Sequence, residues 1–286
     1  MNSTLHPQDS ATQARKLTNL QQRWLTALTL GPLMLLLMGV GGWWFMALAL
    51  LLAVIGVLEF CHLGRNRGVH ARAWVAAAGA VALVLASAIE QTPLWLPIFA
   101  TALLLAWLWS LLARRGVRTS MIDALMTTAA LGYVGLPAAL LVQVRAAPDG
   151  LIWLLLIILL TWGTDTLAYF GGKTWGKTLL APRISPKKTV EGALTGIVGG
   201  VVVALVFLAL AGKLTVILLP LVLIAPVVAV IGDLSESALK RAFAVKDSHL
   251  SHFNLFPGHG GVLDRTDALI LVTWLCYAGY TLLGII

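Results

Sequence analysis

The sequence predicts an all-α, polytopic membrane protein with about nine transmembrane helices. Of its 286 residues, 59% are apolar and 11% are charged, whereas soluble domains carry about 25% charged residues. A helix needs about 20 consecutive apolar residues to cross a bilayer, and nine stretches approach that length. They cover residues 24–39, 43–61, 74–89, 94–112, 122–144, 151–170, 190–210, 214–231 and 268–286. The first and third stretches are short, so eight spans is the alternative count.

The basic residues predict which helix ends face the cytoplasm. If the N-terminus lies inside, 18 of the 20 Lys and Arg residues fall in inside segments, and only Arg145 and Lys213 fall outside. Cytoplasmic loops of membrane proteins are enriched in Lys and Arg, so we expect a cytoplasmic N-terminus and, after nine spans, a C-terminus outside. The net charge of +8 then reflects topology and attraction to anionic lipid, and we expect no nucleic-acid partner.

We divide the chain into three parts. Residues 1–23 are polar and predict a mobile cytoplasmic tail. Residues 24–150 hold about five transmembrane helices with few polar groups; Glu59 and Asp123, near the cytoplasmic boundary, are interpreted as helix-capping or loop-pairing residues. Residues 151–286 hold the remaining helices and two charged cytoplasmic loops, and we predict that they form the catalytic region.

Small residues in this second half allow two interpretations. Gly192, Gly196 and Gly200 recur every four residues at the start of the seventh span. This spacing favours close packing of helices within one chain, with the seam of a homodimer as the alternative. Cys61 and Cys276 lie in separate apolar segments, so we expect neither a disulfide nor a thiolate metal site.

The first charged loop carries a candidate phosphate site. Asp165 lies about five residues inside the end of the sixth span; a carboxylate at the membrane centre costs ~2.5–3.5 kcal/mol and usually faces a cavity and a partner. A structural salt bridge is the alternative. Hydroxyls and lysines then precede the seventh span, whose N-terminal N–H groups favour anions. The residues concerned are Lys177, Ser185, Lys187, Lys188 and Thr189. Lysines that only anchor the helix at the membrane surface are the alternative.

The second charged loop joins the eighth and ninth spans and carries acids at helical spacing. Four polar residues at i, i+3, i+4 and i+7 would share one helix face; they are Asp233, Glu236, Ser237 and Lys240. After a glycine-rich turn, Asp264 and Asp267 share a face of the next helix. Acids gathered in this way repel one another unless cations neutralise them, and oxygen ligands favour Mg²⁺ with bound phosphates. Ordinary ion pairs at helix ends are the alternative.

Basic residues and glycines surround these acids and would bind phosphate. Lys and Arg neutralise a polyphosphate, and glycines let the backbone approach it closely. The residues of this kind are Arg241, Lys246, Arg265, Gly260 and Gly261. His249, His252 and His259 allow a zinc site as an alternative, but carboxylates suit Mg²⁺ better than zinc. We therefore expect His259 to donate a hydrogen bond to phosphate.

These motifs resemble the signature of the phosphatidate cytidylyltransferases, also called CDP-diacylglycerol synthases. The matching segments are Ser237-Ala-Leu-Lys-Arg241, Lys246-Asp247-Ser248, Pro257-Gly-His-Gly-Gly-Val-Leu-Asp-Arg-Thr-Asp267 and, upstream, 165–169, 172–173, 176–177 and 185–192. They cover about the last 130 residues, while the first 150 resemble the family mainly in hydropathy. Two features depart from the family pattern: the segment 249–256 is longer, and Val190 stands where the family often has Trp.

The resemblance implies a reaction of CTP with phosphatidic acid that gives CDP-diacylglycerol and pyrophosphate for phospholipid biosynthesis. It implies an enzyme in a bacterial inner membrane, with its active site on the cytoplasmic face and Mg²⁺ as cofactor; a second cation is left open. The implied metal ligands are Asp233, Asp264, Glu236 and Asp267. The implied catalytic residues are Asp233, Asp264, Lys240, Arg241 and Arg265. The implied substrate-binding residues are Asp165, Lys177, Ser185, Lys187, Lys188, Thr189, Ser237, Lys246, Asp247, His259, Gly260 and Gly261.

Two other functions would also use such groups. A CTP-dependent lipid-alcohol kinase, of the polyprenol or phytol type, would transfer the γ-phosphoryl group instead. A transporter of an anionic solute would also place charges inside the membrane, but it should show related halves. Spans one to five have no counterpart of the acidic helix faces.

Overall fold

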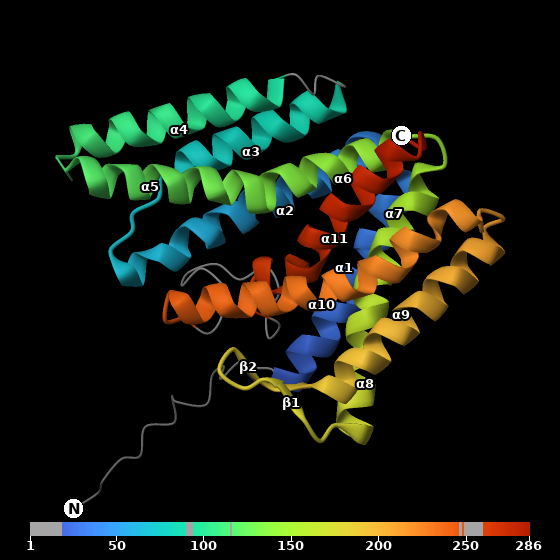
Figure 1. Cartoon of the computed structure of the whole chain (residues 1–286). Coiled ribbons are helices and arrows are strands. Elements are labelled where there is room, and N and C mark those ends of the chain that lie inside the picture. The colour runs from blue at the N-terminus through green and yellow to red at the C-terminus, as the bar shows by residue number, and fades with distance from the viewer. Residues whose placement is uncertain (1–18, 90–93, 115, 246–247, 249–259) are drawn as a thin grey trace, which may run out of the picture.

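The computed structural model describes residues 19–89, 94–114, 116–245, 248 and 260–286 (Figure 1). Most of the predicted tail therefore lies outside the described residues, as do Lys246, Asp247, His249, His252 and His259. Each of the nine predicted apolar stretches is helical over most of its described length.

The protein is a bundle of helices joined by short connections. The α-helices are α1 (Asn19–Val40), α2 (Gly42–Leu63), α3 (Ala73–Ala88), α4 (Trp95–Leu112), α5 (Val117–Ala130), α6 (Leu136–Ala146), α7 (Gly150–Ile158), α8 (Thr164–Trp175), α9 (Val190–Leu210), α10 (Leu219–Ala242) and α11 (Leu263–Leu282). Single helical turns are η1 (Gly64–Arg67), η3 (Leu131–Gly135), η4 (Leu159–Gly163) and η5 (Val216–Leu218).

Six helices in the described part of the chain are long and apolar enough to cross a membrane. They are Gly42–Arg67, Trp95–Leu112, Val117–Ala146, Gly150–Trp175, Val190–Leu210 and Val216–Ala242. The helices Leu28–Val40 and Ala73–Ala88 are apolar but shorter. The protein is thus an all-α polytopic membrane protein, as the sequence predicts.

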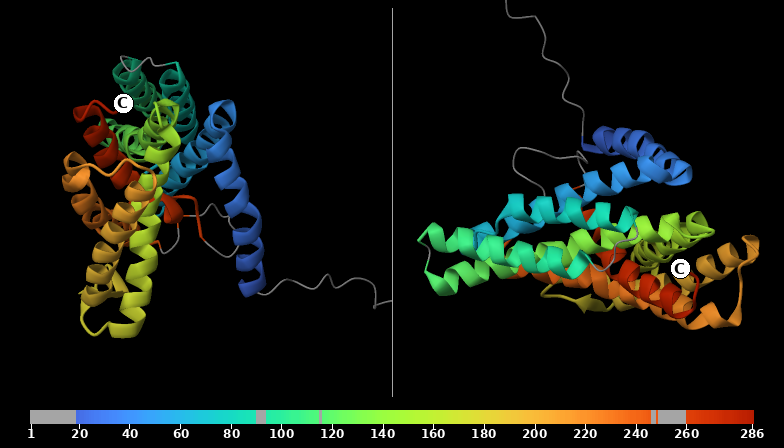
Figure 2. Two further views of the ribbon diagram at one scale, coloured as in Figure 1. Left: turned by 90° about the vertical axis from the view of Figure 1, so that its right-hand side faces the viewer. Right: turned by 90° about the horizontal axis from the view of Figure 1, so that it is seen from above.

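The helices fall into three groups that lie side by side (Figures 1 and 2). Helices α3, α4 and α5 form one group, α2, α6 and α11 lie centrally, and α8, α9 and α10 form the other side. Leu83 of α3, Leu131 of η3 and Leu140 of α6 are fully buried where the first two groups meet. Helix α1 lies at the edge of the molecule and packs chiefly against α2 (Figure 2).

Two of the long helices contain a π-helical turn. Turn η3 connects α5 to α6 and turn η4 connects α7 to α8, each within one continuous helix. A π-turn rotates the faces of the segment that follows it, and such turns are frequent at functional sites. Turn η4 ends at Gly163, two residues before Asp165, and Tyr133 lies within η3.

The glycines of α9 bring its backbone against α8. A Cβ atom at Gly192 would lie 2.9 Å from the Cα of Gly172, and one at Gly196 would lie 2.7 Å from the backbone oxygen of Thr164. A larger side chain at either position would push the two helices apart. Close packing within one chain, the favoured interpretation of this glycine spacing, is confirmed.

A β-hairpin interrupts the helical fold where the sequence predicts only a loop. Strand β1 (Leu179–Ala181) pairs antiparallel with β2 (Ser185–Thr189), with Leu179 opposite Thr189 and Ala181 opposite Ser185. An isolated hairpin is marginally stable, but this one is held by α9. The Glu191 carboxylate accepts hydrogen bonds from the backbone N–H groups of Lys177 (3.0 Å) and Thr178 (3.1 Å).

Candidate active site

The close approach of α10 to α11 builds the centre of the site. A Cβ atom at Gly232 would lie 2.9 Å from the Cα of Ala268, so the two backbones meet where the glycine has no side chain. The helices are antiparallel, and their polar residues therefore pair in reverse order. Asp233 therefore lies at the same height along the helix pair as Asp267, and Glu236 lies at the same height as Asp264.

The layer nearer the connecting loop is held by one lysine. The Lys240 Nζ lies 2.7 Å from Glu236 Oε2 and 2.7 Å from Asp264 Oδ1. All three side chains are largely buried, and the second Glu236 oxygen, Oε1, is buried without a hydrogen-bond partner among the described residues. Lys240 thus bridges an acid on its own helix to an acid on the next.

The second layer lies one helical turn away and gathers acids from three helices. Asp233 forms an ion pair with Lys188 of β2. Asp165 of α8 and Asp267 of α11 both interact electrostatically with Asp233 and with Lys188. Arg265 also interacts with Asp165. Three carboxylates therefore share a small number of cationic partners, and they repel one another.

The glycine-rich turn before α11 is ordered by two carboxylates. Asp264 Oδ2 accepts the backbone N–H groups of Gly261 (2.8 Å) and Ser248 (3.1 Å). Gly260 adopts a φ of +85°, a conformation that glycine tolerates best, and a Cβ at Gly261 would lie 2.4 Å from Ser248 Oγ. Both predicted substrate-binding glycines are thus required by the turn itself.

The second of these carboxylates is Glu59 of α2, which the sequence suggests to be a capping residue. Glu59 is 2% exposed. Its carboxylate accepts the backbone N–H groups of Val262 (3.0 Å) and Leu263 (2.8 Å) and the hydroxyl of Ser248 (3.3 Å). Glu59 therefore caps the N-terminus of α11, which it contacts from more than 200 residues away in sequence, and the capping interpretation is confirmed.

Strand β2 separates the roles of the two adjacent lysines. Successive side chains of a strand point to opposite faces. Lys188 accordingly reaches Asp233, whereas Lys187 is exposed. Thr189 is the N-cap of α9 and accepts the Gly192 N–H at 3.1 Å.

The remaining predicted residues lie around this centre. Lys177 is exposed at the start of the hairpin, Ser185 is half-buried at the start of β2, and Ser237 is half-buried on α10. Arg241 donates to the backbone oxygens of Ile184 (3.4 Å) and Val245 (3.3 Å), so it links α10 to the hairpin. Lys246, Asp247 and His259 lie outside the described residues.

The donor set fits a hard divalent cation. Five carboxylates lie in the two layers, against the cationic side chains of Lys188, Lys240 and Arg265. The carboxylates exceed these cations by two formal charges, which one Mg²⁺ would balance, and carboxylate oxygen is the ligand type that Mg²⁺ prefers. Over the described ranges, no three Asp, Glu, His or Cys side chains already converge as metal ligands. The four predicted ligands instead divide between the two layers.

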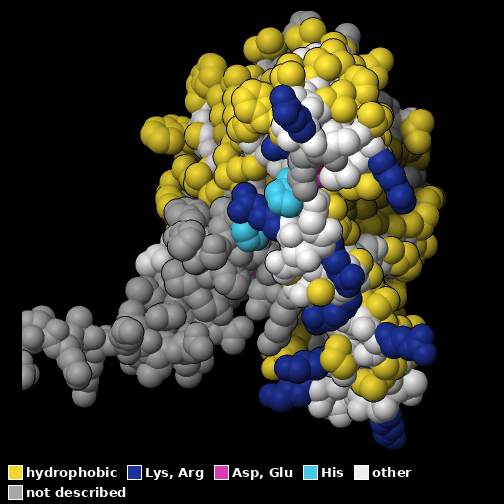
Figure 3. All heavy atoms as spheres, turned by 90° about the vertical axis from the view of Figure 1, so that its left-hand side faces the viewer, with side chains coloured by type: hydrophobic (Ala, Val, Ile, Leu, Met, Phe, Trp, Pro, Cys, Tyr) yellow, Lys and Arg dark blue, Asp and Glu magenta, His cyan; other side chains and the backbone are white. Residues whose placement is uncertain are grey.

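The surface around the site is basic. Figure 3 shows Lys and Arg side chains spread along one face of the molecule, while the acids are almost hidden from view. Hydrophobic side chains cover much of the rest of this view. A polyanion would thus meet basic groups first and reach the buried acids afterwards.

Comparison with known proteins agrees with this chemistry. The model of the cytidylyltransferase family matches residues 21–283. The chain is 34% identical over 271 residues to a phosphatidate cytidylyltransferase of Brucella abortus, covering 91% of this chain and 93% of that protein. It is 33% identical over 237 residues to one of Staphylococcus aureus, covering 81% and 88%.

The chain belongs to the cytidylyltransferase family. Membership makes it a nucleotidyltransferase, and the match extends through the N-terminal half, where the motifs are sparse. The family resemblance predicted from the second half is thereby confirmed.

One residue of this cytidylyltransferase that sequence reasoning missed is Tyr133. Its hydroxyl is buried and has no hydrogen-bond partner within the described part of the chain. The phenol interacts electrostatically with Asp267, Glu236 and Asp233, so it lies near both acidic layers. No motif marks it; the π-turn that carries it becomes visible only in the structure.

Asp123 of this family member stabilises a connection between two helices. Its buried carboxylate accepts the backbone N–H of His70 at 2.7 Å and lies 3.9 Å from Arg72 Nη2. Arg72 also donates to Thr127 and Ser110. Asp123 therefore fixes the connection between α2 and α3, which confirms the loop-pairing interpretation.

Proposed function

We propose that the protein is a CTP:phosphatidate cytidylyltransferase, which makes CDP-diacylglycerol and pyrophosphate for phospholipid biosynthesis. The observation that carries this proposal is the meeting of Asp233, Asp264 and Asp267 with Lys188 and Lys240 between α10, α11 and β2. Its relatives in Brucella abortus and Staphylococcus aureus are named for this activity.

The chemistry requires charge neutralisation more than a base. A phosphate oxygen of phosphatidate attacks the α-phosphorus of CTP, and a new P–O bond forms. The bond from the α-phosphorus to the bridging oxygen breaks, and its electron pair leaves with pyrophosphate. Since the attacking phosphate is already ionised at neutral pH, the obstacle is repulsion between anions. Positioned cations lower that obstacle.

The basic residues would act at two different places, among the acids and at the rim of the site. Lys188, Lys240 and Arg265 lie among the acids and would contact the reacting phosphates. Arg241 lies between α10 and the hairpin and would act from the rim. Residues that would bind the rest of CTP or the lipid phosphate are Lys177, Ser185, Lys187, Thr189, Ser237, Lys246, Asp247, His259, Gly260 and Gly261.

Mg²⁺ is the proposed cofactor. Asp233 and Asp267 in one layer and Glu236 and Asp264 in the other would hold it, with Asp165 beside them. The cation would neutralise charge on the phosphates of CTP. A second cation would have to be balanced by the phosphates of CTP, because one Mg²⁺ already offsets the excess of two carboxylate charges.

We also propose that the chain spans the membrane nine times, with the N-terminus in the cytoplasm and the C-terminus outside. The active site would then face the cytoplasm of a bacterial inner membrane. The two basic residues outside the inside segments contact connections of the same predicted side, which supports the alternation of the spans. Arg145 donates to the backbone oxygen of Met38 in the last turn of α1, beside the connection to α2, and Lys213 pairs with Asp149 in the connection between α6 and α7. Both connections are on the predicted outer side.

The test uses purified protein, phosphatidate, Mg²⁺ and CTP labelled at either the α- or the γ-phosphate. Cytidylyl transfer places the α-label in lipid and the γ-label in pyrophosphate. A lipid-alcohol kinase would place the γ-label in lipid when given a polyprenol. Absence of α-label from the lipid fraction would overturn the proposal.

A further inference from the structure

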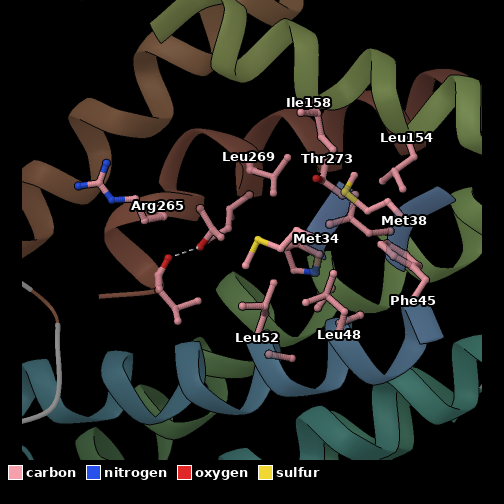
Figure 4. Close-up of a pocket in the computed structure, with 18 of the residues that line it drawn as sticks. Met34, Met38, Phe45, Leu48, Leu52, Leu154, Ile158, Arg265, Leu269 and Thr273 are labelled. Atoms are coloured by element: carbon pink, nitrogen blue, oxygen red, sulfur yellow. Dashed lines mark hydrogen bonds between the residues drawn. The ribbon is translucent and has the colours of Figure 1, made fainter. Parts of the chain in front are cut away.

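An apolar cavity of about 270 Å³ lies between α1, α2, α6, α7 and α11. Figure 4 shows Leu48 and Leu52 on one side of it, Leu154, Ile158 and Leu269 on the other, and Met34 and Met38 between these two groups in this view. The residues that bind nucleotide and metal in the proposed function leave this space unexplained, except where Arg265 borders it.

The size and lining of the cavity suit a hydrocarbon chain. Its volume lies just below the ~300–1,000 Å³ typical of small-molecule sites, so it would hold one chain and not a whole phospholipid. Met34 and Met38 are unbranched and adjust to irregular shapes. A wall of this kind tolerates chains that differ in length or unsaturation.

Arg265 connects the cavity to the candidate active site. It is among the lining residues, and Figure 4 shows its guanidinium pointing away from the apolar side chains. That guanidinium interacts electrostatically with Asp165. A molecule with an anionic head and an apolar tail would place its head beside Arg265 while its tail occupied the cavity.

Helix α1 separates this cavity from the surroundings of the protein. Met34 of α1 lines the cavity, whereas Leu33 and Leu36 of the same helix are exposed. The C-terminal end of α1 is fixed, because Arg145 donates to the backbone oxygens of Met38 (2.7 Å) and Gly39 (2.8 Å). The rest of α1 packs chiefly against α2. An acyl chain from the bilayer would therefore enter the cavity past α1, the part of the cavity wall that is held least firmly.

We propose that this cavity binds one acyl chain of phosphatidate, with α1 as the wall past which the chain enters. This inference rests on the proposed function. Lipid tails are as apolar as the cavity, so transfer of a chain into it adds little affinity. Its effect is to orient the phosphate of the lipid beside Arg265.

The first test fills the cavity. Ala138→Phe places a ring into it from α6, and Leu52→Trp does the same from α2; Ala100→Phe on the exposed face of α4 is the matched control. With dioleoyl phosphatidate we expect kcat/KM to fall about tenfold or more in the filled variants, as for a mismatch in an apolar pocket. With dihexanoyl phosphatidate it should stay close to the normal value, as should the KM for CTP. Equal falls in kcat/KM for both lipids, or no fall with dioleoyl phosphatidate, would overturn the inference.

A second test measures where the acyl chain of phosphatidate binds, independently of turnover. Phosphatidate with a photoreactive group at the end of one acyl chain is incorporated into phosphatidylcholine vesicles with the protein. Adducts should appear on peptides that contain Met34, Leu52 or Leu269, disappear in Ala138→Phe and persist in Ala100→Phe. Adducts confined to exposed residues of α4 or α9 would overturn the inference. Cavity adducts in a protein that transfers no cytidylyl group would support the acyl-chain site and overturn the proposed reaction.

Discussion

The ammonium group of Lys240 lies 2.7 Å from the carboxylate of Asp264, and this ion pair joins α10 to α11. Both side chains are largely buried, at 13% and 8% exposure. The pair lies one helical turn from the layer of Asp233 and Asp267, so it orders the side of the site that faces the connecting loop.

Replacing Lys240 should therefore affect both folding and turnover. Lys240→Met leaves Glu236 and Asp264 facing each other without a cation, and removal of one partner of a buried ion pair costs about 3–5 kcal/mol. We expect a clearly lower Tm and a fall in turnover of about 10²–10³-fold. Lys213→Met is the control, since its exposed pair with Asp149 is worth only ~0–1 kcal/mol. Normal turnover of Lys240→Met would contradict a role in the site.

Removing a carboxylate charge from either acidic layer should lower turnover, and the two losses should be coupled. Asp233→Asn and Asp264→Asn keep the side-chain volume but remove a negative charge, and turnover should fall about 10²–10⁴-fold in each. If both serve one metal site, the double variant should lose much less than the product of the two single losses. The Mg²⁺ concentration that gives half-maximal activity should rise in the more active variant. Asp149→Asn, in an exposed ion pair, is the control. An unchanged Mg²⁺ requirement in an active variant would remove metal binding by that residue from the proposal.

Glu59 should act as a positioning residue. Glu59→Gln offers one acceptor oxygen and a donor amide to a turn that presents two N–H groups and a hydroxyl. A buried donor left without a partner costs about 1–3 kcal/mol, so the Tm should fall by several degrees. Turnover should fall in parallel, while the pH profile keeps its shape, because Glu59 meets no substrate. Loss of turnover at an unchanged Tm would instead indicate direct contact with a substrate.

Tyr133 and Tyr280 should behave in opposite ways. Tyr133→Phe removes a buried hydroxyl that has no hydrogen-bond partner within the described residues, so stability should be unchanged or slightly higher. If that hydroxyl serves the site, turnover should fall about tenfold. Tyr280 donates to the backbone oxygen of Trp153 at 3.2 Å, away from the acids. Tyr280→Phe should therefore lower the Tm and leave turnover per folded molecule unchanged. Normal turnover of Tyr133→Phe would exclude its hydroxyl from the reaction.

The orientation of the helices can be tested with cysteines. In a variant without Cys61 and Cys276, Lys187→Cys and Lys213→Cys are treated in intact cells with a thiol reagent that does not cross membranes. We expect labelling at position 213 and none at position 187 until the cells are opened. The reverse pattern would invert the proposed topology.

The helices of this fold could be predicted because long apolar runs carry their own signal. The hairpin could not, because Ser185-Pro-Lys-Lys-Thr189 has no alternating pattern and its strands depend on Glu191 and Thr189 at the start of α9. The spacing of acids predicted which residues share a helix face. It could not predict that Asp233 and Asp264 occupy different layers, because that follows from the antiparallel packing at Gly232.

Contacts between residues that are distant in the sequence also could not be predicted. Glu59 could be identified as a capping residue, but nothing near it in sequence points to Val262 and Leu263. Tyr133 carried no signal at all. A buried phenol in an apolar helix is usual, and only its position among the acids and the π-turn distinguish it.

The contact between Glu59 and the start of α11 makes the second half of the chain dependent on the first half. Every segment of the family signature lies after residue 160, so a truncated chain that begins there would contain all of its motifs. It would lack the carboxylate that holds the backbone of Val262 and Leu263. Such a fragment should remain inactive alone and should regain turnover only when the first half is produced beside it.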